Sequence, residues 1–457
     1  MSIRTVNPAT GQALAVYEQM SGESAHAVLA TSQTAYLTWR ETAVADRCAL
    51  VGKLAGVLRD NAERYASLMS REMGKPITEA RGEVEKCAWL CEFYAEHAAG
   101  WLADEPVDVD GLKHRVVYEP LGVVLSIMPW NYPFWQALRF GVPTVAAGNT
   151  SLLKHASNVT GCALAIAEAF SLAGFPDGVF QTVVVGHDTV ADLIAQPEIQ
   201  GVSLTGSTDV GRRIAAVAGR HLKKVVLELG GSDPFIVLED ADVEFAARGA
   251  VTGRMLCTGQ SCIAAKRFIV VKDVAEAFTG AFVKGMAALT VGDPMDPSTQ
   301  VGSMVNAQEL ATLQAQLADA VAKGGRVLTG GDPLPGPGCF FPPTVVTDTT
   351  ADMRIVCEEV FGPLAPIIVV QDEDEAIAVA NASEFGLGGS VWTGDPNRGE
   401  RVARRLEVGT AFVNSIVKSD PRMPFGGVKT SGLGRELSRF GLREFTNIKG
   451  LNVYGVG

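Results

Sequence analysis

The sequence lacks any stretch with the length and apolarity of a membrane-spanning helix. In 457 residues no window reaches the roughly 18 apolar side chains that crossing a bilayer requires. The N-terminus, MSIRTVNPATGQALAV, also lacks the apolar core of a secretory signal. Excess positive charge is missing as well, because the net charge is −12 and a phosphate-backbone partner would need a basic face. We therefore expect a cytoplasmic protein with no membrane or nucleic-acid partner.

Cysteine patterns typical of disulfide frameworks or zinc sites are also missing. The eight cysteines are spread along the chain without a secretion signal, which is typical of free thiols. Cys87 and Cys91 lie at a helical spacing, and no CxxC motif or histidine pair accompanies them. This spacing indicates buried core thiols and no metal site.

Neither of the usual nucleotide fingerprints occurs, since both GxGxxG and GxxxxGK[ST] are missing. The composition of 47% hydrophobic and 20% charged residues with 49 glycines is nevertheless that of a compact α/β enzyme. The length suggests about two or three domains.

Short apolar runs alternate with helical patterns along most of the chain, and this alternation predicts doubly wound parallel sheets. The first half should contain a long helix over residues 44–73 and a second over 77–102. A hairpin about Asp110-Gly111 follows, and the tail reads as a strand. We expect a cofactor-binding domain of residues 1–105 and 123–231, a catalytic domain of 232–430, and an oligomerisation element of 106–122 and 431–457.

The stretch from Gly206 to Gly211 lies between a predicted strand and a predicted helix. Backbone N–H groups at such a turn, together with the helix N-terminus, can hold a pyrophosphate. Many strand-to-helix turns carry two glycines, so this motif alone is weak.

Cys262, in GQSC, is a candidate nucleophile if its thiol is exposed and activated. All six histidines precede it, so its base is not a downstream histidine. Glu228 ends a buried strand, where desolvation can raise a carboxyl pKa toward neutrality. The alternatives are a core thiol and a paired structural carboxylate.

Asn131 lies in MPWNYP, in a loop held by two flanking prolines. An amide there can donate a hydrogen bond to a developing oxyanion. An ordinary Asx turn is the alternative.

Seven motifs taken together resemble the aldehyde dehydrogenase family: PWNYP, LLKHAS, TGSTDVG, LELGGSDP, GQSC, EEVFGP and PFGGVKTSG. They cover nearly the whole chain in the family's order. The resemblance implies an aldehyde dehydrogenase-like α/β fold with two doubly wound domains and a small β oligomerisation element.

The resemblance makes Cys262, and not Cys257, the nucleophile that attacks the aldehyde carbon. The oxyanion would be held by Asn131 and the Cys262 backbone N–H. Hydride would leave to a nicotinamide, and water activated by Glu228 would hydrolyse the thioester.

The resemblance also implies a cofactor site. Lys154 would reach the adenosine ribose, and Glu359 and Phe361 would hold the nicotinamide ribose. Where many relatives carry a glutamate, this chain has Ser157, which removes a repulsion of a 2′-phosphate, so NADP should be accepted and preferred, with NAD possible. The full set is Trp130, Lys154, Ser157, Gly206, Ser207, Gly211, Glu359 and Phe361.

Arg139 occupies the place where succinate-semialdehyde dehydrogenases carry an arginine for the substrate's distal carboxylate. Arg254 and Ser419 would complete the clamp, whereas a structural ion pair is the alternative for Arg139. Cys257 departs from the family's asparagine and is either a packed thiol or a redox partner of Cys262.

These residues predict NAD(P)-dependent oxidation of succinic semialdehyde to succinate by a homodimer or homotetramer. Another ω-carboxy or aliphatic aldehyde, such as glutarate semialdehyde, is the alternative substrate. A binding protein without turnover and a thiol hydrolase or esterase are alternatives from other classes.

Overall fold

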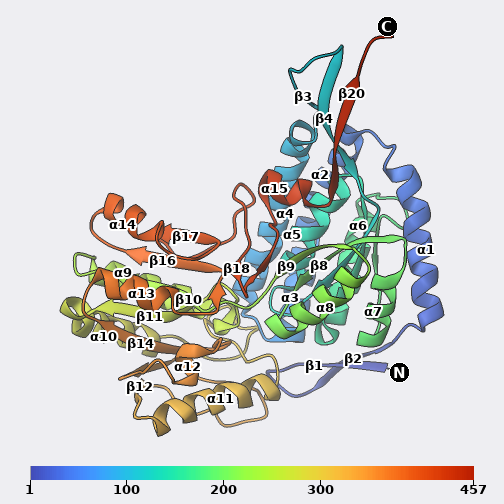
Figure 1. Cartoon of the computed structure of the whole chain (residues 1–457). Helices are drawn as coiled ribbons and strands as arrows, with labels where there is room; N and C mark the ends of the chain where they lie inside the picture. Colours follow the sequence, from blue (N-terminus) through green and yellow to red (C-terminus); the bar gives the residue numbers. More distant parts are fainter. Residues whose placement is uncertain (1, 457) are drawn as a thin grey trace.

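Apolar segments that are buried at every position, such as residues 123–128, are typical of strands covered on both faces. In the computed structural model, which describes residues 2–456, these segments form two large, mostly parallel sheets (Figure 1). Helices cover both sheets, as the alternation of the sequence predicts. The doubly wound α/β fold is therefore confirmed.

The first sheet has the strand order β19-β9-β8-β5-β6-β7 and is parallel apart from β19 at its edge. Helices from the same part of the chain cover it. The strands are β5 (Val123–Met128), β6 (Thr150–His155), β7 (Phe180–Thr182), β8 (Ile199–Thr205), β9 (Lys224–Glu228) and β19 (Gly432–Leu433). The helices are α1 (Gly22–Trp39), α5 (Pro133–Ala146), α6 (Thr160–Leu172), α7 (His187–Ala195) and α8 (Thr208–Arg220).

The predicted single helix over residues 44–73 is wrong, because the structure breaks it into α2 (Val44–Asp60) and α3 (Ala62–Met73). Asn61 lies between them with φ −109° and ψ 13°, and its side-chain amide donates to the carbonyl of Val57. Asparagine competes for backbone groups in this way and so favours helix ends. The next helix, α4 (Ile77–Trp101), agrees with its prediction to within one residue.

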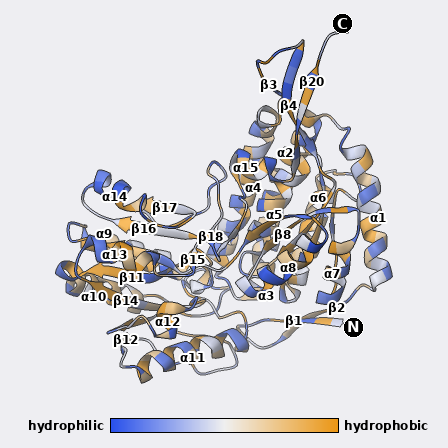
Figure 2. Cartoon of the chain, in the orientation of Figure 1, coloured by the Kyte–Doolittle hydropathy of each residue, from blue (hydrophilic) through white to orange (hydrophobic). Residues whose placement is uncertain are grey.

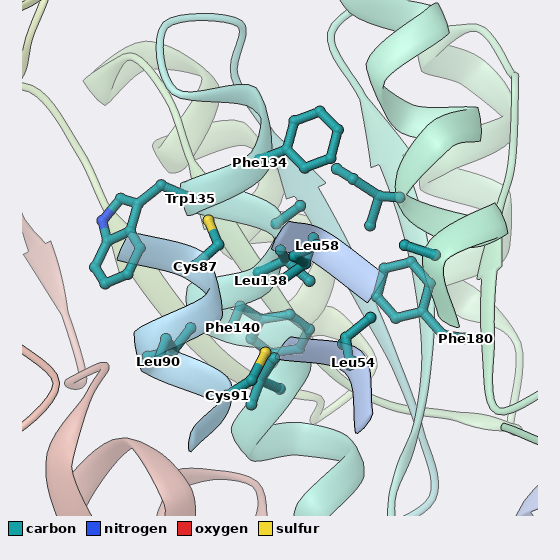
Figure 3. Close-up of a cluster of buried hydrophobic side chains, with 14 of the residues drawn as sticks. Leu54, Leu58, Cys87, Leu90, Cys91, Phe134, Trp135, Leu138, Phe140 and Phe180 are labelled. Atoms are coloured by element: carbon teal, nitrogen blue, oxygen red, sulfur yellow. The ribbon is translucent and has the colours of Figure 1, made fainter. Parts of the chain in front are cut away.

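The main core lies where α2, α4 and α5 pack together, and Figure 3 shows part of it. Cys87 and Cys91 point into this cluster beside Leu90 and Leu138, and both cysteines have no exposed surface. The interpretation of these two thiols as core residues is confirmed. The same packing fixes α5 against α4.

The second sheet has the order β12-β13-β14-β11-β10-β16-β17, with only β12 antiparallel to its neighbour. The apolar strands at the centre of both large sheets stand out in Figure 2. The strands are β10 (Asp233–Val237), β11 (Ala265–Val271), β12 (Arg326–Thr329), β13 (Thr344–Thr347), β14 (Leu364–Val370), β16 (Gly388–Trp392) and β17 (Thr410–Val413). The helices are α9 (Val243–Met255), α10 (Lys272–Ala287), α11 (Ala307–Ala322), α12 (Arg354–Cys357), α13 (Glu373–Asn381) and α14 (Pro396–Ala403).

The predicted hairpin and the tail strand form a third, antiparallel sheet that projects from the body (Figure 1). It consists of β3 (Glu105–Pro106), β4 (Lys113–Pro120) and β20 (Thr446–Val453). The tail range 431–457 does not belong wholly to this sheet, since β19 pairs with β9 and α15 (Ser438–Glu444) packs on α5. Two short two-stranded sheets complete the fold: β1 (Ser2–Val6) with β2 (Ala13–Glu18), and β15 (Phe385–Gly386) with β18 (Val428–Lys429).

Within residues 2–456, no helix has both the length and the apolar character needed to cross a membrane. The predicted division of the chain into a cofactor-binding, a catalytic and an oligomerisation part concerns what each part binds. It therefore stays a prediction.

Candidate active site

Two cavities meet at Cys262, which follows the short 3-10 helix η2 (Leu256–Gly259) and precedes β11. The small cavity measures about 270 Å³ and the large cavity about 580 Å³. Only two side chains line both cavities as the described residues form them, Cys262 and Gln136. The thiol therefore has access to two separate spaces, which suits a reaction between two bound molecules.

The small cavity collects the residues that follow three neighbouring strands of the first sheet. Trp130 and Asn131 follow β5, Gly206 and Ser207 follow β8, and Gly230 follows β9. The carboxyl ends of parallel strands meet at one edge of a sheet, which is where such folds bind ligands. Glu359 and Phe361, in the loop between α12 and β14, also line the cavity, and the Phe361 ring lies edge-on to Trp130, with 5.6 Å between centroids.

The Cys262 thiol is half-buried, and its own backbone carbonyl accepts a 2.7 Å hydrogen bond from the Lys266 ammonium group. Burial raises the pKa of this thiol to about 12, although the charges of Lys266 and Arg139 oppose the rise. The thiol is therefore protonated at neutral pH. It needs a base or an additional positive charge beside it before it can act as a nucleophile.

Cys257 lies in the loop that leads to Cys262 and is fully buried. Its backbone is left-handed, with φ 54°, and the next residue, Thr258, has φ 59°. Asparagine adopts this region far more readily than most residues, so a cysteine there is unusual. The Cys257 thiol donates to the Asn131 carbonyl at 3.2 Å, and burial raises its pKa to about 12. Cys257 is thus a packed thiol, while a disulfide with Cys262 stays a prediction.

The Asn131 side chain is buried and bonded at both ends of its amide. Its Nδ2 donates to the backbone carbonyl of Gln260 at 3.0 Å, and its Oδ1 accepts from Gln136 Nε2 at 3.3 Å. Its oxygen accepts from a side chain and not from a backbone N–H of its own turn, and Pro133, two residues on, has no N–H to donate, so the Asx-turn alternative is wrong. The amide instead faces the small cavity, which it lines together with Cys262.

Glu228 ends β9 and is 3% exposed. Neither of its carboxylate oxygens has a hydrogen-bond partner among the described residues, so the alternative of a paired structural carboxylate is wrong. Burial raises the pKa of Glu228 well above its ordinary value, and the neighbouring charge of Glu436 raises it further. The side chain lines neither cavity as the described residues form them. Its role as the base stays a prediction.

Glu359 is held at the small cavity by an ion pair with Lys266 at 3.3 Å and by the backbone N–H of Gly231 at 3.0 Å. A Cβ atom on Gly230 would lie 2.5 Å from the Glu359 carboxylate, and one on Gly231 would lie 2.8 Å from the Cys262 carbonyl. The two glycines of LELGG therefore let the end of β9 approach both groups closely.

The turn after β8 was predicted to hold a pyrophosphate between Gly206 and Gly211, and only its first residues line the small cavity. Ser207 caps α8, and a Cβ atom on Gly206 would meet open space. Gly211 is different, because it lies inside α8 and a Cβ atom there would be 2.5 Å from the Leu229 side chain. Gly211 thus permits helix packing and does not line the cavity.

Lys154 and Ser157 lie outside the small cavity, at the carboxyl end of β6 and just beyond it. Lys154 is half-buried, and burial lowers its pKa. Ser157 is exposed. Their place next to the end of β5 extends the same edge of the sheet toward solvent.

Arg139 lies on α5, is 2% exposed and lines the large cavity. Its guanidinium group forms an ion pair with Glu436 and lies over the Phe425 ring, 4.8 Å from the centroid. The ion pair is thus not within its own helix. Arg139 combines a structural ion pair with a position at the cavity wall.

The prediction that Arg254 joins a substrate clamp is wrong. Arg254 has no exposed surface, and its guanidinium group donates to backbone carbonyls that hold the loops around the site. Those acceptors use the donors that a substrate carboxylate would need. They are the carbonyls of Ala265, Gly259, Val360 and Gly362.

Ser419 lines the large cavity and accepts a 2.8 Å hydrogen bond from Lys86, a residue that the sequence did not single out. The role of Ser419 in a substrate clamp stays a prediction. The Lys86 ammonium group lies 4.1 Å from the centroid of the Trp135 ring. Burial lowers the pKa of Lys86 to about 8, and the charge of Arg139 lowers it further. The large cavity therefore contains a second cation, Lys86, beside Ser419.

The start of α5 is held by an acidic side chain of α4. The Glu83 carboxylate accepts from the backbone N–H groups of Phe134 and Trp135, both at 2.9 Å, and forms an ion pair with the buried Lys75. A carboxylate at a helix N-terminus is favourable. This contact fixes α5, and with it Gln136 and Arg139, against α4.

A half-buried thiol between two cavities, with an amide that lines one of them, is compatible with covalent catalysis by cysteine once the thiol is activated. The model of the aldehyde dehydrogenase family matches residues 1–451. The chain belongs to the aldehyde dehydrogenase family.

Individual relatives agree over nearly the full length. The chain is 47% identical to a probable succinate-semialdehyde dehydrogenase (NADP+) of Synechocystis sp., covering 98% of this chain and 99% of the relative. The same identity and coverage hold for succinate-semialdehyde dehydrogenase (NADP+) 1 of Mycobacterium ulcerans. The crystal structure of succinic semialdehyde dehydrogenase from Streptococcus pyogenes in complex with NADP+ superposes with a TM-score of 0.97 at 36% identity, covering 99% of this chain and all of the other.

Proposed function

We propose that this protein oxidises succinic semialdehyde to succinate with NADP, and that it also accepts NAD. The observation that carries the proposal is the large cavity, where Arg139 and Lys86 place two cations within a pocket that reaches Cys262. A four-carbon aldehyde with a distal carboxylate matches this pocket, because its aldehyde group can react with Cys262 while its carboxylate pairs with the two cations. The two succinate-semialdehyde dehydrogenases named above support the same substrate. Glutarate semialdehyde, one carbon longer, is the alternative.

In the proposed reaction the Cys262 thiol first loses its proton to solvent, which the positive charge of an oxidised nicotinamide beside it would favour. The thiolate then attacks the aldehyde carbon, and the carbonyl oxygen becomes an oxyanion. The Nδ2 group of Asn131 donates a hydrogen bond to that oxyanion, which is typically worth a factor of about 10²–10³ in rate. A nicotinamide held in the small cavity beside Glu359 and Phe361 would supply the acceptor for the hydride of the same carbon. A thioester on Cys262 remains, and water then hydrolyses it to release succinate.

Glu228 is the proposed base for that water. Its unpartnered, desolvated carboxyl group has a raised pKa, which suits proton transfer near neutral pH. In the described structure it lines neither cavity, so it would reach the water only after a side-chain movement. The absence of a histidine after position 221 leaves this carboxyl group as the natural candidate.

The residues at the edge of the first sheet fit a dinucleotide. The turn after β8 offers the open space beside Gly206 and the N-terminus of α8, which favours a pyrophosphate. Lys154 and Ser157 lie on the neighbouring strand end, where a cation without an opposing carboxylate suits a 2′-phosphate. Glu359 and Phe361 are proposed to hold the nicotinamide ribose within the small cavity, beside Trp130.

Arg139, Ser419 and Lys86 form the proposed carboxylate clamp. The Lys86–Ser419 hydrogen bond places a hydroxyl and an ammonium group side by side, and Arg139 faces the same space. Hydrogen bonds between ionised partners are roughly twice as strong as neutral ones. The aromatic rings of Trp135 and Phe425 lie against these cations and limit their hydration.

Reduced-cofactor formation at 340 nm tests this proposal. Succinic semialdehyde, glutarate semialdehyde and butanal would each be supplied with NADP and with NAD. We expect the highest kcat/KM for succinic semialdehyde with NADP. Equal kcat/KM values for succinic semialdehyde and butanal would mean that Arg139 has only a structural role. A higher value for glutarate semialdehyde would establish the alternative.

The projecting three-stranded sheet is the proposed contact between copies of this chain. It exposes the apolar side chains of Leu112, Ile448 and Tyr454. Light scattering of the purified protein should give a dimeric or tetrameric mass, and a double substitution of Leu112 and Ile448 by serine should reduce it.

A further inference from the structure

We propose that Gln136 is a positioning residue that fixes which way the Asn131 amide faces, and that Arg139 in turn fixes Gln136. This inference rests on the proposed role of Asn131 as the oxyanion donor. It adds a second task for Arg139, whose proposed task is to bind the distal carboxylate. It also connects the two cavities through one buried side chain.

The three side chains form an unbroken series of hydrogen bonds. Arg139 Nη2 donates to Gln136 Oε1 at 3.2 Å, and Gln136 Nε2 donates to Asn131 Oδ1 at 3.3 Å. All three residues are at most 3% exposed. Bulk water therefore does not compete for these groups.

The direction of the series follows from the chemistry of arginine. A guanidinium group can only donate, so it requires the oxygen of the Gln136 amide to face it. The nitrogen of Gln136 must then face Asn131 and can only donate, so it requires the oxygen of the Asn131 amide. The Asn131 nitrogen is left facing the opposite way, toward the carbonyl of Gln260.

Both ends of the Asn131 amide thus agree on one orientation. Gln136 supplies a donor to its oxygen, and the Gln260 carbonyl supplies an acceptor to its nitrogen. Turning the amide over would lose both hydrogen bonds and set like groups against each other. Because Nδ2 has two hydrogens and Gln260 takes one, the other is available to an oxyanion at Cys262.

The position of Gln136 agrees with this task. It and Cys262 are the two side chains that line both cavities in the described structure. It lies three residues before Arg139 on α5, so the same helix presents both side chains on one face. A change at Arg139 in the large cavity would therefore reach Asn131 in the small one through Gln136.

The test uses Gln136→Glu, which keeps the shape and the acceptor for Arg139 but removes the donor to Asn131. The new carboxylate would attract the Asn131 nitrogen through a charge-assisted hydrogen bond and turn the amide away from its productive orientation. The readout is the burst rate of reduced-cofactor formation in the intact enzyme with saturating butanal. We expect a fall of about 10- to 100-fold, because most of the benefit of one oxyanion donor is lost.

The Asn131→Ala background separates positioning from a direct effect of the new charge. If Gln136 acts through Asn131, Gln136→Glu should slow that background by less than about 2-fold, as a double-mutant cycle requires for residues acting in series. The same large factor in both backgrounds would overturn the proposal. If Asn131→Ala alone leaves the burst unchanged, the role of Asn131 itself is wrong, and the proposed function fails separately from Gln136.

A neutral variant guards against misfolding of the charged one. Gln136→Met removes both hydrogen bonds with a similar volume, and we expect a smaller fall, of about 3- to 10-fold, that again disappears in the Asn131→Ala background. The KM for butanal should change little in either variant, because the amide acts on the oxyanion and not on binding. A rise in KM with an unchanged burst rate would overturn the positioning role.

Discussion

The small and the large cavity share Cys262, yet their walls are made of different material. The small cavity is lined on one side at the ends of β5, β8 and β9, where Gly206 and Gly230 leave the backbone uncovered, and on another side by side chains of α11 and by Glu359 and Phe361. The large cavity is lined by long side chains of α4, α5 and α9 and of the segment 416–425. Its charged members include Lys86 and Arg139.

This difference separates cofactor binding, which is the same for every aldehyde, from the recognition of a particular aldehyde. The backbone groups that lie uncovered at the strand ends suit a cofactor, whose phosphates and riboses are the same in every turnover. A wall of side chains suits discrimination between aldehydes, since one buried charge changes which distal group is accepted. Gln136 belongs to both walls and couples them.

Loss of the shared thiol should abolish the function of both cavities at once, and this is the largest effect we predict. Cys262→Ala should lower kcat by at least about 10⁴-fold with succinic semialdehyde and with butanal, because no other group can take its place as nucleophile. The matched control is Cys257→Ser, whose hydroxyl can still donate to the Asn131 carbonyl. It should stay within about 3-fold of the parent. Comparable losses in both variants would contradict the choice of Cys262.

The strand-end side of the small cavity could be predicted from the sequence, because its residues follow strands directly, whereas the side formed by α11 could not. Once β5, β8 and β9 are recognised, the residues after them must share one edge, so Trp130, Gly206 and Leu229 come together without further information. The fold itself was predictable for the same reason, since alternation at short range fixes a parallel sheet.

The large cavity was less predictable, because helical spacing does not say what a face meets. Lys86 is one of several charged residues along α4, and only the packing of α4 on α5 turns it toward Ser419. Arg254 illustrates the opposite error: the sequence analysis placed it in the clamp, yet the backbone carbonyls of the surrounding loops accept its hydrogen bonds. The break at Asn61 likewise depends on a local side-chain bond that periodicity does not reveal.

The next largest effect should concern the large cavity and should lower the activity toward succinic semialdehyde more than the activity toward butanal. Arg139→Met should lower kcat/KM for succinic semialdehyde by about 100-fold, since a charge-assisted hydrogen bond to a carboxylate contributes about 1.5–3 kcal/mol. Butanal should lose about 10-fold, because Gln136 loses the donor that orients it. The exposed Lys53, which lines neither cavity, provides the control: Lys53→Met should change either value by less than about 3-fold. Equal losses of kcat/KM for both aldehydes would show that Arg139 does not bind the substrate carboxylate.

A substitution at the edge of the first sheet should affect the cofactor and leave aldehyde preference unchanged. Ser157→Glu should lower the ratio of kcat/KM with NADP to that with NAD by about 30-fold, because a carboxylate would repel the 2′-phosphate. Ser157→Ala, which adds no charge, should alter that ratio by less than about 3-fold. Steady-state kinetics at fixed succinic semialdehyde provide the measurement. An unchanged ratio in Ser157→Glu would place the 2′-phosphate elsewhere.

The smallest predicted effect is a pH dependence carried by Lys86. Its pKa is lowered to about 8, first by burial and then by Arg139 on α5, while Cys87 and Glu83 on α4 and Asp420 on the C-terminal segment oppose that shift. The ammonium group is therefore charged below pH 8 and neutral above it, and its attraction for a substrate carboxylate is lost as the pH rises. We expect the ratio of kcat/KM for succinic semialdehyde to that for butanal to fall about 5-fold between pH 7 and 9.5.

Taking this ratio cancels the ionisation of Cys262, which affects both aldehydes equally. In Lys86→Met the ratio should be lower at pH 7 and independent of pH over the same range, whereas Lys86→Arg should keep it high throughout, because a guanidinium group stays charged. A pH-dependent ratio that survives in Lys86→Met would assign the titration to another group of the large cavity. The clamp would then rest on Arg139 and Ser419, and the cation contributed by α4 would only support the packing of Trp135.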